Sequence, residues 1–182
     1  MKKIVFINGS AKRLGATDEI VNLIIKYLDK SHFECQIVNL SEHNVNYCKG
    51  CRACHETAEC VLHDDMTEIL SCIDSSDIVV MISPSYWADI TGQMKVFIDR
   101  CTPYCDTHEP HATLSLGKIG YAVALRTGQN PGECLHIIDS FNHFYGHMQI
   151  AAAGSFYLCG IDTPQDVQQF EEKIADFAQT IK

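Results

Sequence analysis

The stretch Lys3-Ile4-Val5-Phe6-Ile7-Asn8, followed by Gly9-Ser10-Ala11-Lys12-Arg13-Leu14-Gly15-Ala16-Thr17, decides the fold of this chain. The residues up to Asn8 form a short, continuous apolar run, which is the pattern of a parallel β-strand buried on both faces. A polar loop follows, and residues 18–30 then repeat their apolar side chains at helical spacing. The order is therefore strand, polar loop and helix, as at the start of an α/β fold.

The loop between this strand and this helix has the composition of a phosphate-binding segment. A helix start presents unpaired amide protons and the positive end of the helix dipole. Ser10, Lys12, Arg13 and Thr17 add hydroxyl groups and positive charge to it. The loop matches neither the G-x-G-x-x-G fingerprint nor the Walker loop G-K-[ST]. An ordinary strand-to-helix turn is the alternative interpretation, and the loop alone leaves both open.

The rest of the chain continues the alternation of strands and helices. The remaining strands are predicted at residues 34–40, 77–83, 118–126 and 148–158, and the remaining helices begin near residues 65, 92, 131 and 164. Such alternation favours a doubly wound, five-stranded parallel sheet of flavodoxin-like type, with strand order 2-1-3-4-5 and helices on both faces. No repeat or linker divides the series, so residues 1–182 are expected to form a single domain.

Two further loops follow strands at the same edge of this predicted sheet, where open α/β sheets bind their ligands. Pro84-Ser85-Tyr86-Trp87 contains the only tryptophan, and Thr127-Gly128 begins the loop after the strand at 118–126. A phosphate at the first loop, a flat ring at the second and polar ring edges at the third describe flavin mononucleotide (FMN). Taken alone, Tyr86 and Trp87 could equally pack on a neighbouring helix or at a subunit interface.

The segment Tyr47–Cys60 is the most specific feature of the chain. It places four of the ten cysteines, Cys48, Cys51, Cys54 and Cys60, within thirteen positions, with gaps of two, two and five residues. Thiolates are the ligands of iron-sulfur clusters, and two-residue gaps let one loop wrap a cubane. Structural zinc usually takes two separated pairs of Cys or His, so zinc would have to recruit His55 or His63. Reduced thiols that line a pocket are the third interpretation.

Composition excludes several classes of function. A net charge of −9 argues against a nucleic-acid partner, and no apolar run approaches the length of about 18 residues that a membrane span needs. The start of the chain lacks the pattern of a signal peptide, so a cytoplasmic location is expected. In a reducing compartment the cysteines are ligands or buried thiols rather than disulfides. The remaining cysteines are interpreted as core or incidental thiols: Cys35, Cys72, Cys101, Cys105, Cys134 and Cys159.

Some polar side chains are predicted to be solvated and without a special role. The helix expected at residues 92–104 has Lys95, Asp99 and Arg100 on the face opposite its apolar residues. His108 and His111 lie in a segment of low hydrophobicity, residues 106–117, which is expected to be a surface loop.

The quoted motifs resemble those of a known family. Gly9 to Thr17 resembles the flavin-phosphate loop of the NAD(P)H-dependent FMN reductase-like flavoproteins, usually G-S-P-R-x-x-G-N-T. Pro84 to Trp87 and Met94-Lys95-Val96-Phe97-Ile98-Asp99-Arg100 resemble their P-x-Y-W and M-K-x-F-x-D-R segments, so the similarity spans most of the chain. The cysteine motif, with Asp64-Asp65-Met66 after it, resembles the iron-sulfur flavoproteins of anaerobic prokaryotes. This resemblance implies electron transfer between a 4Fe-4S cluster and FMN.

The resemblance also implies a role for individual residues. The phosphate would be held by Ser10, Lys12, Ala16 and Thr17, and the isoalloxazine would be lined by Pro84, Ser85, Tyr86 and Trp87. The polar edge of the isoalloxazine would contact Thr127 and Gly128. The cluster would be ligated by Cys48, Cys51, Cys54 and Cys60. Lys12 replaces the usual arginine and Ala16 the usual asparagine, which removes a bidentate fork and a side-chain donor. We therefore expect weaker phosphate binding. No catalytic residue is predicted, because the flavin carries the chemistry.

Partners follow from the same resemblance. NAD(P)H or a small redox protein such as ferredoxin would donate electrons, a small molecule would accept them, and the chain would form a homodimer or homotetramer. The cysteine loop, residues 47–63, would be an insertion after the second strand of the FMN-binding domain. Two alternatives stay open. One is an FMN-only NAD(P)H-dependent oxidoreductase that reduces quinones, flavins or other small acceptors, and the other is a zinc-stapled module that binds a protein.

Overall fold

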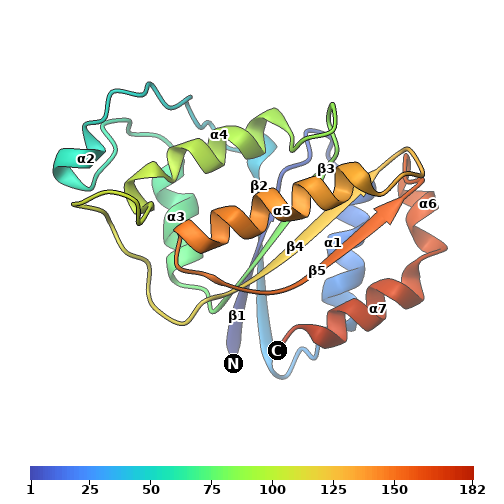
Figure 1. The fold of residues 1–182 in the computed structure, drawn as a ribbon. Helices are drawn as coiled ribbons and strands as arrows, with labels where there is room; N and C mark the ends of the chain where they lie inside the picture. Colours follow the sequence, from blue (N-terminus) through green and yellow to red (C-terminus); the bar gives the residue numbers. More distant parts are fainter.

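A five-stranded parallel sheet forms the centre of the computed structural model, which describes all residues of the chain (Figure 1). Its strands are β1 (Lys2–Asn8), β2 (Phe33–Asn39), β3 (Ile78–Pro84), β4 (Ile119–Arg126) and β5 (Ala151–Cys159). They pair in parallel in the order β2-β1-β3-β4-β5. The predicted fold class and strand order are confirmed, and the largest error is at β5, which begins three residues after the predicted residue 148.

The central strands are the ones with continuous apolar runs. All of Ile78 to Ser83 in β3 is buried, and so is Ile4 to Asn8 in β1. Parallel strands covered by helices on both faces need apolar side chains at every position, which explains the run. The edge strand β2 instead has exposed residues at Glu34, Gln36 and Ile37, and only Val38 is buried.

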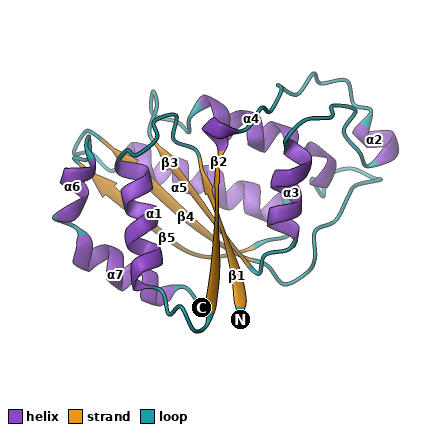
Figure 2. Ribbon diagram, turned by 180° about the vertical axis from the view of Figure 1, so that it is seen from behind, coloured by secondary structure: helices purple, strands orange, loops and turns teal.

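Helices cover both faces of the sheet (Figures 1 and 2). They are α1 (Ala16–Tyr27), α2 (Cys54–Thr57), α3 (Met66–Asp74), α4 (Gly92–Arg100), α5 (Gly132–His147), α6 (Pro164–Gln168) and α7 (Glu171–Thr180). One hydrophobic core lies under α1, α6 and α7, and a second lies under α3, α4 and α5. None of the helices is both long and apolar enough to cross a membrane.

Two predicted helices differ from the structure, and one helix was not predicted. The helix expected at 92–104 ends at Arg100 and continues as a 3-10 turn over Thr102–Tyr104, because Pro103 cannot continue an α-helix. The last helix is divided into α6 and α7, with Phe170 outside helical geometry between them. The short helix α2 was not predicted, since one turn inside a cysteine-rich loop has no apolar periodicity.

Candidate functional site

The loops after β1, β3 and β4 line one cleft at the carboxyl edge of the sheet. The lining residues are Ser10, Lys12, Gly15, Ala16 and Thr17 from the first loop, Pro84, Ser85 and Tyr86 from the second, Leu125, Arg126 and Thr127 from the third, and Ile161 and Asp162 after β5. The cleft has a volume of about 170 Å³. The structure therefore brings together all the residues predicted for the flavin except Trp87 and Gly128, which are outside this lining.

The first loop is held in place by hydrogen bonds of the Asn8 and Ser10 side chains. Asn8 accepts a hydrogen bond from the Ser10 amide at 2.9 Å and donates one to Asp18 at 2.6 Å. The Ser10 hydroxyl in turn bonds the backbone of Lys12. The first residue before α1 is Gly15, which has no side chain to cap the helix. The first-turn amides of α1 are thus without a side-chain cap, which suits an anion.

The two basic residues of this loop differ in their surroundings. Arg13 forms ion pairs with Asp18 at 3.2 Å and Glu42 at 2.9 Å, so its charge is already neutralised. Lys12 forms no ion pair and lines the cleft. Lys12 is therefore the cation of this loop that is available to a bound anion.

Arg126 is a cleft residue that the sequence pattern did not single out. It is the last residue of β4, and its guanidinium donates to the Asn130 carbonyl at 2.6 Å and pairs with Glu133 at 3.0 Å. The Nε of Arg126 is buried and has no hydrogen-bond partner in the protein. A buried donor without a partner is costly, so Arg126 is a second available donor at this cleft. Its place at the carboxyl end of a central strand was the signal that could have identified it.

The aromatic turn after β3 projects from the surface. Tyr86 and Asp89 close it through paired backbone hydrogen bonds of 2.8 and 3.2 Å, and Trp87 and Ala88 have left-handed backbones with φ of 53° and 65°. Trp87 is 103% exposed and Tyr86 is 46% exposed. The alternative in which Trp87 packs on a neighbouring helix is therefore wrong, and a ligand or another subunit remains to cover it.

The four clustered cysteines line a separate cavity of about 320 Å³. Cys48 and Cys51 are exposed, whereas Cys54 and Cys60 are half-buried. The loop curves tightly because Gly50, Arg52 and Ala58 all have left-handed backbones, with φ of 60°, 61° and 59°. Arg100 and Pro103, at the carboxyl end of α4, form the opposite wall.

Arg100 corrects one prediction, because it is buried instead of solvated. It is 2% exposed and forms a bidentate pair with Asp64, at 2.6 and 3.0 Å. Its guanidinium also donates to the carbonyl oxygens of Asn46 at 2.8 Å and Leu62 at 3.4 Å. Helical periodicity placed Arg100 on the polar side of α4 with Lys95 and Asp99, which are exposed, but the cysteine loop covers Arg100 at the end of the helix. Arg100 thus ties down both ends of this loop.

The Arg100–Asp64 pair also sets the electrostatics of the cysteine cavity. The hydrogen bond from Arg100 holds the pKa of the Asp64 carboxyl well below its ordinary range. The Nε of Arg100 is buried and, like that of Arg126, donates to no oxygen or nitrogen of the protein, and the guanidinium lies beside the Cys60 thiol. The wall of the cysteine cavity therefore contains a permanent cation with one unsatisfied donor, which suits a negatively charged occupant.

His108 and His111 were predicted to be solvated, but both are partly buried in the structure. The ring of His108 stacks on that of His55 in the cysteine loop, with centroids 4.0 Å apart, and its Nε2 lies 3.0 Å from the Thr102 carbonyl oxygen. The side chain of His111 is 13% exposed. The segment folds back on itself through a backbone hydrogen bond from Ala112 to Pro103, at 2.7 Å, and so packs against the cysteine loop.

The fold and the cleft define a class of protein. A doubly wound sheet of order 2-1-3-4-5 that brings an uncapped helix start, an aromatic turn and a third polar loop to one edge is a flavodoxin-like flavin-binding protein. The chain belongs to the NADPH-dependent FMN reductase family, whose model matches residues 2–163. FMN is its cofactor, and the chain is a flavin-dependent oxidoreductase.

Three individual proteins illustrate what this chain is similar to. The chain is 40% identical over 126 residues to an iron-sulfur flavoprotein of Archaeoglobus fulgidus, a match that covers 69% of this chain and 55% of that protein. It is 25% identical over 189 residues to an iron-sulfur flavoprotein of Methanosarcina thermophila, covering 99% and 97% of the two chains. A solved NAD(P)H:quinone oxidoreductase from Methanothermobacter marburgensis superposes with a TM-score of 0.72 at 14% identity, covering 98% and 94%, which shows the shared fold.

Proposed function

We propose that this chain transfers electrons between a 4Fe-4S cluster held by Cys48, Cys51, Cys54 and Cys60 and an FMN at the carboxyl edge of the sheet. The observation that carries the proposal is the cysteine cavity: all four thiols line it, and the partnerless Nε of buried Arg100 belongs to its wall. A cluster with four thiolate ligands is anionic, so it would use this donor. The relatives that are named iron-sulfur flavoproteins support the same assignment.

The spacing of the thiols favours a cluster over zinc. Sulfurs that bind one tetrahedral zinc ion at about 2.3 Å lie about 3.8 Å from one another. No three of the four sulfurs in this loop lie within 4.8 Å of one another, although all four line the same cavity. A cubane presents its iron atoms at separate corners and so fits more widely spaced thiolates. The zinc-stapled module is therefore the weaker alternative.

The cleft at the sheet edge fits one end of FMN. Its volume of about 170 Å³ is below the range of about 300 to 1,000 Å³ for pockets that enclose a whole ligand. The uncapped start of α1, with Ser10, Lys12 and Thr17, would bind the phosphate there. The ring would extend over the exposed Tyr86 and Trp87, with Thr127 and Gly128 beside its polar edge.

When bound, FMN accepts an electron pair and the cluster exchanges single electrons, so together they convert between the two modes. The FMN cleft and the cysteine cavity lie at opposite ends of α4. The amino end of α4 lies at the FMN side, where Thr91 bonds the Gly9 carbonyl, and its carboxyl end carries Arg100. Nine residues of helix span about 14 Å. We infer that assembly into a homodimer or homotetramer brings one subunit's cysteine loop near another's FMN.

The remaining parts of the proposal concern partners and location. NAD(P)H, as in the family, or a small redox protein such as ferredoxin would be the electron donor, and a small molecule would be the acceptor. The protein would act in the cytoplasm as a single FMN-binding domain with the cysteine loop inserted after β2. The second candidate function is an FMN-only NAD(P)H-dependent oxidoreductase, in which the cysteines remain thiols. Iron content decides between the two.

A Lys12→Ala variant tests the phosphate site. Lys12 is exposed and has no ion-pair partner, so its removal should leave the fold intact. We expect about a tenfold weaker affinity for FMN, equivalent to about 1.4 kcal/mol, because one cation-phosphate contact is lost. Riboflavin lacks the phosphate, so its affinity should stay the same in titrations followed by flavin fluorescence. An equal loss of affinity for both flavins would place the phosphate elsewhere.

A further inference from the structure

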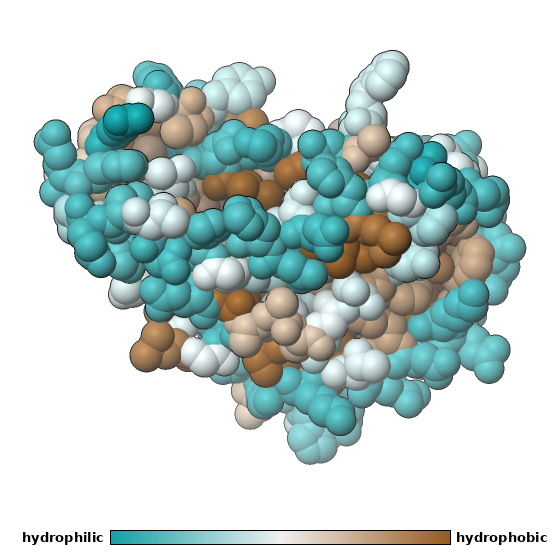
Figure 3. All heavy atoms as spheres, viewed as in Figure 1, coloured by the Kyte–Doolittle hydropathy of each residue, from teal (hydrophilic) through white to brown (hydrophobic).

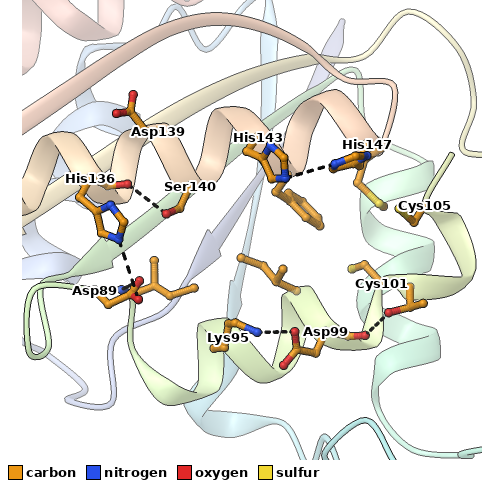
Figure 4. Close-up of a pocket in the computed structure, with 15 residues that line it drawn as sticks. Asp89, Lys95, Asp99, Cys101, Cys105, His136, Asp139, Ser140, His143 and His147 are labelled. Atoms are coloured by element: carbon orange, nitrogen blue, oxygen red, sulfur yellow. Dashed lines mark hydrogen bonds and ion pairs between the residues drawn. The ribbon is translucent and has the colours of Figure 1, made fainter. Parts of the chain in front are cut away.

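A groove of about 600 Å³ separates α4 from α5 on the outer face of the molecule. Figure 3 shows this face, where hydrophilic residues cover the helices and hydrophobic atoms are visible in the depression between them. The α5 side of the groove carries His136, Ser140, His143 and His147 on one face of the helix (Figure 4). These residues line neither the FMN cleft nor the cysteine cavity, so the function described above does not use them.

Two of these histidines face each other at the spacing of metal ligands. His143 and His147 are one helical turn apart, and their Nε2 atoms are separated by 3.2 Å. Two imidazole nitrogens bound to one tetrahedral zinc ion at about 2.0 to 2.1 Å lie about 3.4 Å apart. A histidine pair at i and i+4 on one helix is also the arrangement that helical zinc sites use. The pair is therefore close to ligand geometry before any ion binds.

The segment after α4 brings a thiol and a carboxylate close to His147. Cys105 Sγ, a carboxylate oxygen of Asp106 and a ring nitrogen of His147 lie within 4.8 Å of one another. Asp106 Oδ1 lies 3.0 Å from Nδ1 of His147, and the Asp106 amide donates to the His147 carbonyl at 3.2 Å. Figure 4 shows Cys105 next to His147 at this end of the groove. The backbone contact fixes the segment to the end of the helix.

We propose that His143 and His147 bind a divalent transition-metal ion, most readily zinc, through their Nε2 atoms, and that Cys105 becomes the third ligand after rotation of its side chain. Asp106 accepts the Nδ1 proton of His147 and so leaves Nε2 free for the metal, which is the usual carboxylate–histidine–metal arrangement. His147 is also the last residue of α5, where the negative end of the helix dipole favours a cation. The hydroxyl of Thr107, 3.1 Å from Cys105 Sγ, remains available to donate to the thiolate.

The ligand types decide the class of metal. Two imidazoles and one thiolate select zinc or its neighbours cobalt, nickel and copper, whereas magnesium and calcium require oxygen ligands. Three protein ligands leave the fourth tetrahedral position open to water. The ion would link the segment after α4 to the carboxyl end of α5 and close one end of the groove. This site does not depend on the cluster or on FMN.

The test uses the protein purified with its own cofactors and equilibrated with zinc chloride. We expect one zinc ion per chain, and a zinc K-edge X-ray absorption spectrum with about two nitrogen neighbours and one sulfur neighbour. His143→Ala and His147→Ala should each weaken zinc binding by about tenfold or more, and Cys105→Ser should remove the sulfur neighbour. His136→Ala is the matched control, because His136 lies on the same face of α5 and its side chain pairs with Asp89, at 4.0 Å, instead of with His143 or His147.

Thermal unfolding gives a second readout that does not depend on the spectrum. Zinc should raise the Tm of the wild type and of His136→Ala, but not that of His147→Ala, because only an ion bound to the folded state stabilises it. His143 is exposed, so its replacement should not impair folding. Zinc affinity unchanged in both His143→Ala and His147→Ala, or a shell of four sulfurs, would overturn the proposal, since the ion would then bind elsewhere.

Discussion

An Arg100→Leu variant should lose about 3 to 5 kcal/mol of unfolding free energy, because it leaves the Asp64 carboxylate buried without a counter-charge. The two side chains are 1% and 3% exposed, so water cannot replace the lost partner. The variant also removes the hydrogen bonds to the Asn46 and Leu62 carbonyls, which fix the ends of the cysteine loop. Urea unfolding followed by circular dichroism measures the loss.

Lys95→Leu is the matched control for this variant. Lys95 is also a basic residue of α4, but its ion pair with Asp99 is exposed, with side chains 59% and 44% accessible. Exposed pairs contribute about 0 to 1 kcal/mol, so the control should unfold close to the wild type. Equal small losses in the two variants would contradict the role given to the buried pair.

The same pair predicts how the difference depends on pH. The pKa of Asp64 is lowered in the folded wild type, so its contribution is complete above the unfolded pKa of about 4 and declines as the pH falls below that value. Arg100→Leu lacks this contribution. The stability gap between wild type and Arg100→Leu should therefore be widest near neutral pH and narrow below pH of about 4.

A Cys51→Ala variant should lose the four-iron cluster while it keeps FMN. Cys51 lines the cysteine cavity and none of the FMN cleft, so the two cofactors should respond separately. The expected result is a fall from about four iron atoms per chain to a small remainder, because a cubane in this loop has no spare ligand. The iron-to-FMN ratio of anaerobically purified protein measures this loss of iron.

Cys72→Ala is the control for this experiment. Cys72 is half-buried in α3, outside the loop, where its sulfur accepts a hydrogen bond from Gln36 at 3.0 Å. Its replacement should leave the iron-to-FMN ratio at the wild-type value. A wild-type iron-to-FMN ratio in Cys51→Ala, or an equal loss of iron in both variants, would show that the cysteine loop does not hold the cluster.

Patterns along the chain were sufficient to predict the sheet and the place of the cleft. The apolar runs of β1 and β3 are continuous because helices cover both faces, and this pattern is visible without coordinates. Parallel strands also bring their carboxyl ends to one edge, so the loops after β1, β3 and β4 had to converge. The cysteine spacing likewise indicated one shared site, and the four thiols do line one cavity.

Interactions between distant segments could not be predicted in this way. Arg100 was assigned to the solvated face of α4 because helical periodicity does not reveal that residues 46–64 cover its side chain at the end of the helix. His143 and His147 have visible i, i+4 spacing, but Cys105 and Asp106 reach His147 only through the folded connection after α4. Whether a polar residue is buried depends on its tertiary partners, which local sequence does not contain.

The most direct test of the account is the iron, acid-labile sulfide and FMN content of wild-type protein purified without oxygen, with an absorption spectrum of the same sample. We expect about four iron atoms and four sulfides per chain beside one FMN, and a broad absorption at about 400 nm that bleaches on reduction. FMN without iron, persisting after anaerobic reconstitution with iron and sulfide, would contradict it. Cys48, Cys51, Cys54 and Cys60 would then be thiols of an FMN-only oxidoreductase.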